Sequence, residues 1–142
     1  MRLMRYLAIA VFLMSFWSSS AQDEIRGLWL AGEGKTKVKI METSSGAYEG
    51  KVIWLKDSVD RNGNPRVDTK NPDANLRDRP IVGISILEEI VFEDGAWNAM
   101  IYAPKRGRRL PCKLTIDELD QLNIEVSVMG MTRNQVWTKA DL

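Results

Sequence analysis

The stretch LPCKLTIDELDQLNIEVSV, residues 110–128, gives the clearest indication of the fold. Apolar side chains occupy every second position from 110 to 116 and again from 122 to 128, on either side of a polar turn signal at 118–120. Alternation with a period of two is typical of β-strands that bury one face. The stretch therefore predicts two long antiparallel strands joined by a hairpin turn.

The same pattern extends over most of the chain. Short turn signals separate the alternating runs, so nearly all connections have the length of a hairpin. A meander of long strands leaves two exposed edges unless the sheet closes, which favours an all-β, eight-stranded up-and-down antiparallel barrel. A two-sheet sandwich is the alternative. We predict strands at residues 25–31, 36–42, 47–56, 81–92, 96–103, 108–117, 121–129 and 132–139.

The first 21 residues have the pattern of a secretory signal peptide. Arg2 and Arg5 are followed by a predominantly apolar run of twelve residues, Tyr6 to Trp17, and then by small residues that end at Ala21. The run is shorter than the roughly 20 residues that span a bilayer. We expect cleavage after Ala21, a single domain at residues 22–142 without a transmembrane segment, and export to a periplasm or out of the cell.

Composition excludes several classes of protein. Without residues 1–21 the chain has 18 basic and 19 acidic residues, and this balance disfavours a nucleic-acid binder. The chain has no histidine, the commonest general base and metal ligand. Its single cysteine, Cys112, lies on the apolar side of its strand and is expected to be a small buried hydrophobe. We therefore expect no enzyme activity, no catalytic residues, no metal and no cofactor.

Residues 57–80 form the only long connection that the pattern predicts. The segment Asn71-Pro72-Asp73 is typical of a helix start, with Asn71 as the cap and one helical turn at 74–77. An ordered loop of this length across the mouth of a barrel is commonly functional. We expect this loop to act as a lid.

Oxygen ligands at alternating positions in this loop resemble the start of a calcium site. Asp60, Asn62 and Asp68 could supply them, but Pro65 and Asn71 stand where an EF-hand requires glycine and glutamate. An EF-hand is therefore rejected, and a solvated turn around Asn62 explains the same residues.

A series of short motifs follows in order along the chain. They include Gly27-Leu28-Trp29, Tyr48-x-Gly50-Lys51-Val52-x-Trp54, Asp60-x-Asn62-Gly63-Asn64-Pro65, Asn71-Pro72-Asp73, Leu76-Arg77-x-Arg79-Pro80, Ile101-Tyr102-x-Pro104, Cys112-x-Leu114 and Trp137-Thr138-Lys139. Together they resemble a known family of exported bacterial proteins, the domain-of-unknown-function 2147 family. The resemblance covers essentially the whole chain after residue 21 and implies a lipocalin-like β-barrel.

The resemblance also implies a role for Trp29. Lipocalin-like barrels carry a glycine-x-tryptophan at the start of the first strand, where the indole closes one end of the barrel. A basic side chain near the last strand packs across it, and here Arg133 or Lys139 would supply that cation. Trp29 is thus expected to be a structural plug.

Two functions remain open. The fold implied by the resemblance favours a carrier of a small hydrophobic or amphipathic ligand, because an eight-stranded barrel can hold one small ligand or be filled by side chains. The alternative is an envelope interaction protein with a filled barrel whose loops bind a protein or an anionic polymer. In an eight-stranded meander the long loop and the basic turn at 104–109 lie at one end, so we expect a basic rim that attracts anionic head groups and surfaces. Its members are Arg77, Arg79, Lys105, Arg106, Arg108 and Arg109.

Overall fold

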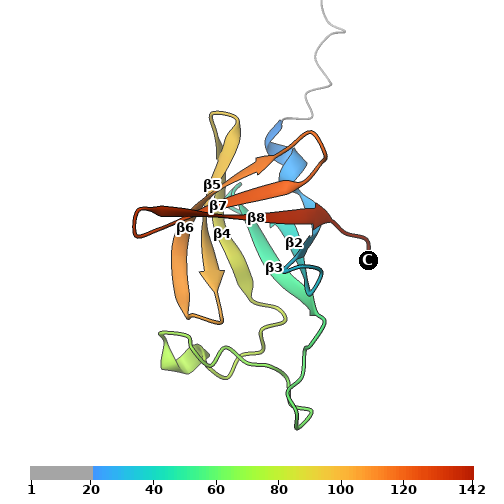
Figure 1. The fold of residues 1–142 in the computed structure, drawn as a ribbon, viewed down its shortest axis with the longest axis vertical. Coiled ribbons are helices and arrows are strands. Elements are labelled where there is room, and N and C mark those ends of the chain that lie inside the picture. The colour runs from blue at the N-terminus through green and yellow to red at the C-terminus, as the bar shows by residue number, and fades with distance from the viewer. Residues whose placement is uncertain (1–20) are drawn as a thin grey trace, which may run out of the picture.

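The computed structural model describes residues 21–142, which form a closed β-barrel (Figure 1). Each strand pairs antiparallel with the next along the chain, and β8 returns to β1. The prediction of an eight-stranded up-and-down barrel is confirmed, and the sandwich is wrong. The signal peptide expected at residues 1–21 lies outside the described residues, except for Ala21. The strands are β1 (Gly27–Ala31), β2 (Thr36–Glu42), β3 (Tyr48–Leu55), β4 (Ser85–Glu93), β5 (Ala96–Ala103), β6 (Arg108–Ile116), β7 (Leu122–Val128) and β8 (Met131–Lys139).

Two boundary predictions are wrong for local reasons. Strand β4 begins at Ser85 and not at 81, because residues 81–84 form a turn in which Gly83 has a φ of 106° and donates its N–H to the carbonyl of Val52. The short helix η2 (Ala74–Leu76) is a 3₁₀ turn whose cap is Asp73, since its carboxylate accepts the N–H of Asn75. The predicted cap, Asn71, is buried, and its side-chain amide donates to Asp68, as described below.

Alternate side chains of the strands fill the barrel and form one hydrophobic core. The inward positions carry large residues, so this part of the barrel is packed and not hollow. The fully buried side chains are Trp29, Trp137, Tyr102, Ile25, Ile40, Leu87, Ile90, Leu114, Leu122, Ile124, Val38 and Val52. Within residues 21–142 no helix is long and apolar enough to cross a membrane.

The two ends of the barrel differ. The turns β2–β3, β4–β5 and β6–β7 lie at one end together with the 3₁₀ helix η1 (Ala21–Ile25), which we call the closed end (Figure 1, upper part). The turns β1–β2, β5–β6 and β7–β8 and the long β3–β4 connection, residues 56–84, lie at the opposite end, which we call the open end.

Trp29 is completely buried where η1 meets the barrel. Its indole Nε1 donates to the carbonyl of Ile25 at 2.9 Å, and the ammonium of Lys139 lies 5.4 Å from its ring centroid. Arg133 lies on the same strand, six residues before Lys139. It is exposed and pairs with Val126 of β7. Lys139, and not Arg133, is therefore the cation that lies over Trp29.

Residues of η1 are tied to the strands by hydrogen bonds. Trp97 Nε1 donates to the carbonyl of Gln22 at 3.1 Å, and the Tyr48 hydroxyl donates to the Asp23 carboxylate. This bond to Asp23, reinforced by burial, raises the pKa of Tyr48 to about 12. The hydroxyl therefore stays protonated at neutral pH and keeps η1 on the closed end.

The closed end predicts a test of Trp29. Changing Trp29 to alanine should lower the free energy of unfolding by about 3–5 kcal/mol, because the substitution leaves a cavity in a packed core. Urea denaturation measures this loss. The matched control is Trp54→Ala, since Trp54 is 40% exposed on the outside of the barrel and should cost less than about 1 kcal/mol. Equal losses at the two positions would contradict a structural role for Trp29.

Candidate functional site at the open end of the barrel

Strand β8 is much longer than the seam that closes the barrel. In the described part of the chain β8 pairs with β1 at two positions, Trp29 with Lys139 and Leu30 with Thr138. The rest of β8, from Met131 to Val136, continues past the β1–β2 turn with β7 as its paired neighbour. The barrel wall is thus incomplete beside this half of β8.

The uncovered half of β8 presents its inner face to solvent. Gln135 pairs with Ile124 and Arg133 pairs with Val126, and both of these β7 residues point into the core. Residues that pair across two strands lie on the same face of the sheet. Gln135 and Arg133 therefore lie on the inner face of β8, yet both are exposed.

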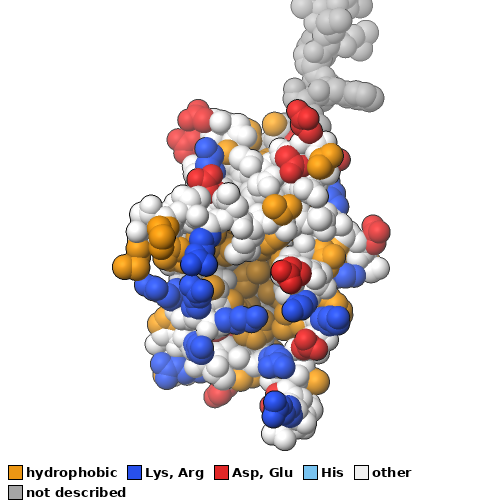
Figure 2. Space-filling model, in the orientation of Figure 1, with side chains coloured by type: hydrophobic (Ala, Val, Ile, Leu, Met, Phe, Trp, Pro, Cys, Tyr) orange, Lys and Arg blue, Asp and Glu red, His pale blue; other side chains and the backbone are white. Residues whose placement is uncertain are grey.

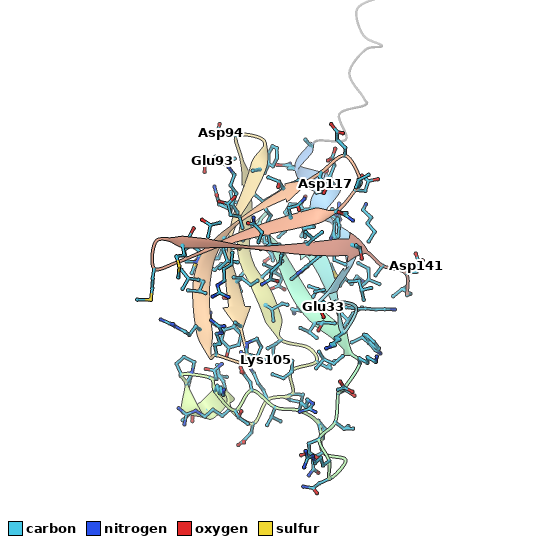
Figure 3. The ribbon with its side chains drawn as sticks, viewed as in Figure 1. Glu33, Glu93, Asp94, Lys105, Asp117 and Asp141 are labelled. Atoms are coloured by element: carbon cyan, nitrogen blue, oxygen red, sulfur yellow. The ribbon has the colours of Figure 1, made fainter. Side chains whose placement is uncertain are left out.

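Figure 2 shows a recess with a hydrophobic floor below β8, with lysine and arginine side chains on either side of it. Glu33, from the β1–β2 turn, and Lys105, from the β5–β6 turn, both lie at this end of the barrel below β8 (Figure 3). We call this hollow the apolar recess.

Two arginines belong to the inner faces of the strands at this recess. Arg133 does so through its pairing with Val126. Arg108 lies on the inner face of β6, because it is two positions before Leu110 and four positions before the buried Cys112, and every second residue of a strand faces the same side. Both are exposed, and no ion pair of either is found within residues 21–142. They are cations beside an apolar surface.

The other predicted rim residues divide into two groups. Lys105 and Arg106 are exposed in the β5–β6 turn, as Arg108 is at its end. Arg109 instead forms a 2.9 Å ion pair with Glu88 and lies over the ring of Tyr102, with its guanidinium carbon 5.2 Å from the centroid.

Arg77 and Arg79 hold the long connection in place. Arg77 Nε donates to the carbonyl of Asn71 at 2.8 Å, and Arg79 forms a 3.1 Å ion pair with Asp68. Of the six residues expected in a basic rim, Lys105, Arg106 and Arg108 are thus exposed and form no ion pair within residues 21–142, and the other three are engaged in holding the structure together.

Asp68 is the centre of this arrangement and is completely buried. Its Oδ2 accepts from Asn71 Nδ2 at 2.8 Å and from Arg79 at 3.1 Å, and its Oδ1 accepts from the Tyr102 hydroxyl at 2.7 Å. Since Tyr102 belongs to β5, these bonds tie the long connection to the barrel wall.

The electrostatics of this cluster favour a charged Asp68. Burial, the largest single influence, raises the pKa of Asp68, but the hydrogen bonds from Asn71, Tyr102 and Arg79 outweigh it and hold the pKa below its usual value. Burial and the bond to Asp68 also raise the pKa of Tyr102 to about 12. At neutral pH the carboxylate is therefore ionised and the phenol is protonated.

A backbone contact fixes the connection at a second point. Gly107, in the β5–β6 turn, has a φ of 62°, and a Cβ atom added there would lie 1.8 Å from the carbonyl oxygen of Lys70. Only glycine allows this close approach. The long connection is therefore anchored on the β5–β6 hairpin and does not hang free over the mouth.

The described residues lack a metal-binding cluster and an ionised thiol. Among residues 21–142 no group of three or more histidine, cysteine, aspartate or glutamate side chains could hold a metal ion. Cys112 is buried, and its burial raises its pKa to about 12, so its thiol is protonated at neutral pH. Asp68, considered above as a calcium ligand, is instead occupied by three protein donors.

Sequence reasoning missed the Asp68 cluster and the inner face of β8. Asn71 and Tyr102 stand in the motifs from which the resemblance was drawn, but only the fold brings them to Asp68. The position of Arg133 could have been found from the sequence, since it alternates with Trp137 on one face of a strand.

Comparisons with known proteins agree with this architecture. The family model described as "Uncharacterized protein conserved in bacteria (DUF2147)" matches residues 27–139. A solved structure, "Protein HP1028 from the human pathogen Helicobacter pylori belongs to the lipocalin family", is similar with a TM-score of 0.68 and 18% identity over 82% of each chain. No curated protein matches the chain. At this identity the likeness shows the fold alone, and the lipocalin-like barrel expected from the sequence is confirmed.

The Asp68 cluster predicts a local effect on the long connection. Changing Asp68 to asparagine replaces an acceptor by an amide donor that faces the donors of Asn71 and Arg79. We expect a loss of about 1–3 kcal/mol in the free energy of unfolding and faster tryptic cleavage within residues 56–84. The control is Asp60→Asn in the same loop, where an asparagine oxygen can still accept from the backbone. Similar cleavage rates for both variants would contradict the anchoring role of Asp68.

The same cluster predicts the pH dependence of stability. The pKa of Asp68 is lower in the folded than in the unfolded chain, where it is about 4. Its contribution is therefore fully present above about pH 4 and is lost as the pH falls through the folded pKa. In urea denaturation, the difference between the native protein and Asp68→Asn should be constant between about pH 5 and 7 and should shrink below about pH 4. A difference that grows on acidification would contradict this assignment.

Proposed function

The chain belongs to the bacterial family DUF2147, and we propose that its barrel binds a small amphipathic anion at the open end. The apolar part of the ligand occupies the recess below β8, and its anionic head contacts Arg108 and Arg133. The observation that carries this proposal is the exposed inner face of β8, where a barrel strand would ordinarily be buried.

Packing supports a shallow site. Trp29 and Trp137 are fully buried and fill the half of the barrel near the closed end, so a ligand has room only toward the mouth. Leu110 and Val128 are partly buried on the inner faces of β6 and β7, next to the core. Apolar surface of this kind, with a few polar groups at its edge, is typical of small-molecule sites.

Charge supports an anionic head group. Arg108 and Arg133 reach the recess from two different strands, and a guanidinium can bind a carboxylate or phosphate through two parallel hydrogen bonds. Most other arginines that we expected in the rim already have partners in the protein. A neutral apolar ligand would leave both inner-face arginines without a partner.

The expected signal peptide supports a setting in the cell envelope, in a periplasm or outside the cell. We further propose that the protein acts as a carrier and not as an enzyme. Its exposed inner-face residues, Gln135 and Arg133, can bind and orient a ligand, and neither is a usual nucleophile or general base.

The second candidate is an interaction protein whose loops bind another macromolecule. The packed core favours it, because the large buried side chains leave little interior volume. The two candidates differ in one respect: only the carrier requires the recess below β8 to be accessible.

Two fluorescent probes test the carrier. Anilinonaphthalene sulfonate is anionic and N-phenylnaphthylamine is neutral, and we expect the protein to bind both. Changing Arg133 to glutamine should lower the affinity for the anionic probe roughly tenfold, because a charge-assisted hydrogen bond is lost. The affinity for the neutral probe should stay unchanged. Arg61→Gln, on the exposed surface of the long connection, is the matched control and should change neither affinity.

Filling the recess tests its location. Gln135→Trp places a large side chain on the inner face of β8 and should abolish binding of both probes. Asn134→Trp is the control, because Asn134 lies on the outer face of the same strand and pairs with the exposed Glu125. If both tryptophan variants bind the probes as the native protein does, the recess is not the site and the second candidate is favoured.

A further inference from the structure

The β7–β8 turn ends in exposed apolar side chains. Met129 is 90% exposed and Met131 is 61% exposed, and the partly buried Val128 precedes them. The turn projects from the barrel beside the recess (Figure 1), and Figure 2 shows a hydrophobic group at this projecting end with basic side chains next to it. We call residues 128–131 the apolar tip.

Turn geometry does not account for a methionine at this place. Met129 and Gly130 have φ values of 49° and 77°, which are those of a two-residue type I′ hairpin turn. The first position of such a turn favours asparagine, aspartate or glycine, and a bulky side chain there is strained. The apolar tip therefore carries a side chain that is unfavourable for the turn and for its exposure to water.

Charge is polarised along the barrel although the chain is nearly neutral. At the closed end, residues 21–26 and the three turns hold six acidic residues and one basic residue, Arg26. At the open end, the long connection and the three turns hold nine basic and six acidic residues. Figure 3 labels Glu93, Asp94 and Asp117 near the closed end. An anionic surface would thus attract the open end and repel the closed end.

Exposed cations flank the apolar tip. The register that pairs Cys112 with Val126 places Arg108 of β6 level with Gly130 in the turn. Lys105 and Arg106 are exposed in the neighbouring β5–β6 turn. The segment from Val126 to Val136 contains no acidic residue that would oppose an anionic surface.

We propose that the open end docks reversibly on an anionic phospholipid bilayer. Met129 and Met131 enter the boundary between head groups and acyl chains, while Lys105, Arg106 and Arg108 contact lipid phosphates. Buried apolar area and electrostatic attraction to anionic lipids both strengthen peripheral membrane binding, and the open end offers both. Docking in this orientation faces the recess toward the membrane. It goes beyond the proposed function, because it does not require the recess to hold a ligand.

Vesicle sedimentation of residues 22–142 tests the docking. We expect binding to vesicles of phosphatidylglycerol mixed with phosphatidylcholine, weaker binding at high salt, and little binding to phosphatidylcholine alone. Met129→Asn should weaken binding to the anionic vesicles roughly tenfold, because it removes one inserted side chain. Asparagine suits the turn, so this variant should keep its fold. The matched control is Leu119→Asn in the β6–β7 turn at the closed end, where Leu119 is 77% exposed, and it should bind as the native protein does.

An environment-sensitive fluorophore tests insertion directly. Attached to Met129→Cys, it should shift to the blue on addition of anionic vesicles, and attached to Leu119→Cys it should not. The native protein, whose Cys112 is buried, is the labelling blank. Absence of binding by the native protein, equal binding by Met129→Asn, or equal shifts at both labels would overturn the proposal. Binding to soluble polyglutamate as tight as to vesicles would also overturn it, in favour of an acidic polymer.

Titration of the two probes without vesicles separates the two proposals. Met129→Asn should bind both probes with native affinity, since Met129 lies at the turn and outside the recess. If the native protein binds neither probe, the carrier proposal is wrong and the docking proposal is unaffected. If the native protein binds the probes but not the vesicles, the docking proposal is wrong and the carrier proposal is unaffected.

Discussion

The pairing of Trp29 with Lys139 and of Leu30 with Thr138 closes the barrel, and the point where this seam ends determines how much of β8 is covered by β1. The seam lies beside the buried indole of Trp29, so closure and packing reinforce each other at one end of the molecule. Beyond it β8 continues without β1, and its inner face reaches solvent. One short seam thus produces both a packed end, which stabilises the fold, and an accessible end, where we propose that a ligand binds.

The long connection, residues 56–84, is attached to the barrel wall at the open end. Asp68 receives hydrogen bonds from Asn71, Arg79 and Tyr102, and Lys70 lies against Gly107. A buried carboxylate is tolerated only when its partners compensate for lost hydration, and here three donors do so. The connection is consequently a fixed part of the rim and not a freely moving lid, and two arginines expected to face a ligand, Arg77 and Arg79, instead hold it in place.

The alternation at residues 110–128 predicted the barrel because a period of two and hairpin-length turns leave few other solutions for an all-β chain. The DUF2147 resemblance and the burial of Cys112 could also be predicted, since each depends on local sequence. The cluster around Asp68 could not, because Asp68 and Tyr102 are 34 residues apart and only the fold brings them together. The choice between Arg133 and Lys139 as the cation over Trp29 could not be predicted either, because the two lie six residues apart on the same face of β8 and only the pairing register shows that Lys139 is beside Trp29. The engagement of Arg109 with Glu88 escaped prediction for the same reason.

If the open end beyond the seam binds a ligand in the cell, as we propose, the protein purified from its native source should carry that ligand. Native mass spectrometry measures this. We expect a bound anionic amphiphile of small mass on the native protein, which is lost from Gln135→Trp and retained by Asn134→Trp. A native protein that carries no small molecule under conditions that preserve its fold, or a ligand that survives in Gln135→Trp, would contradict this proposal.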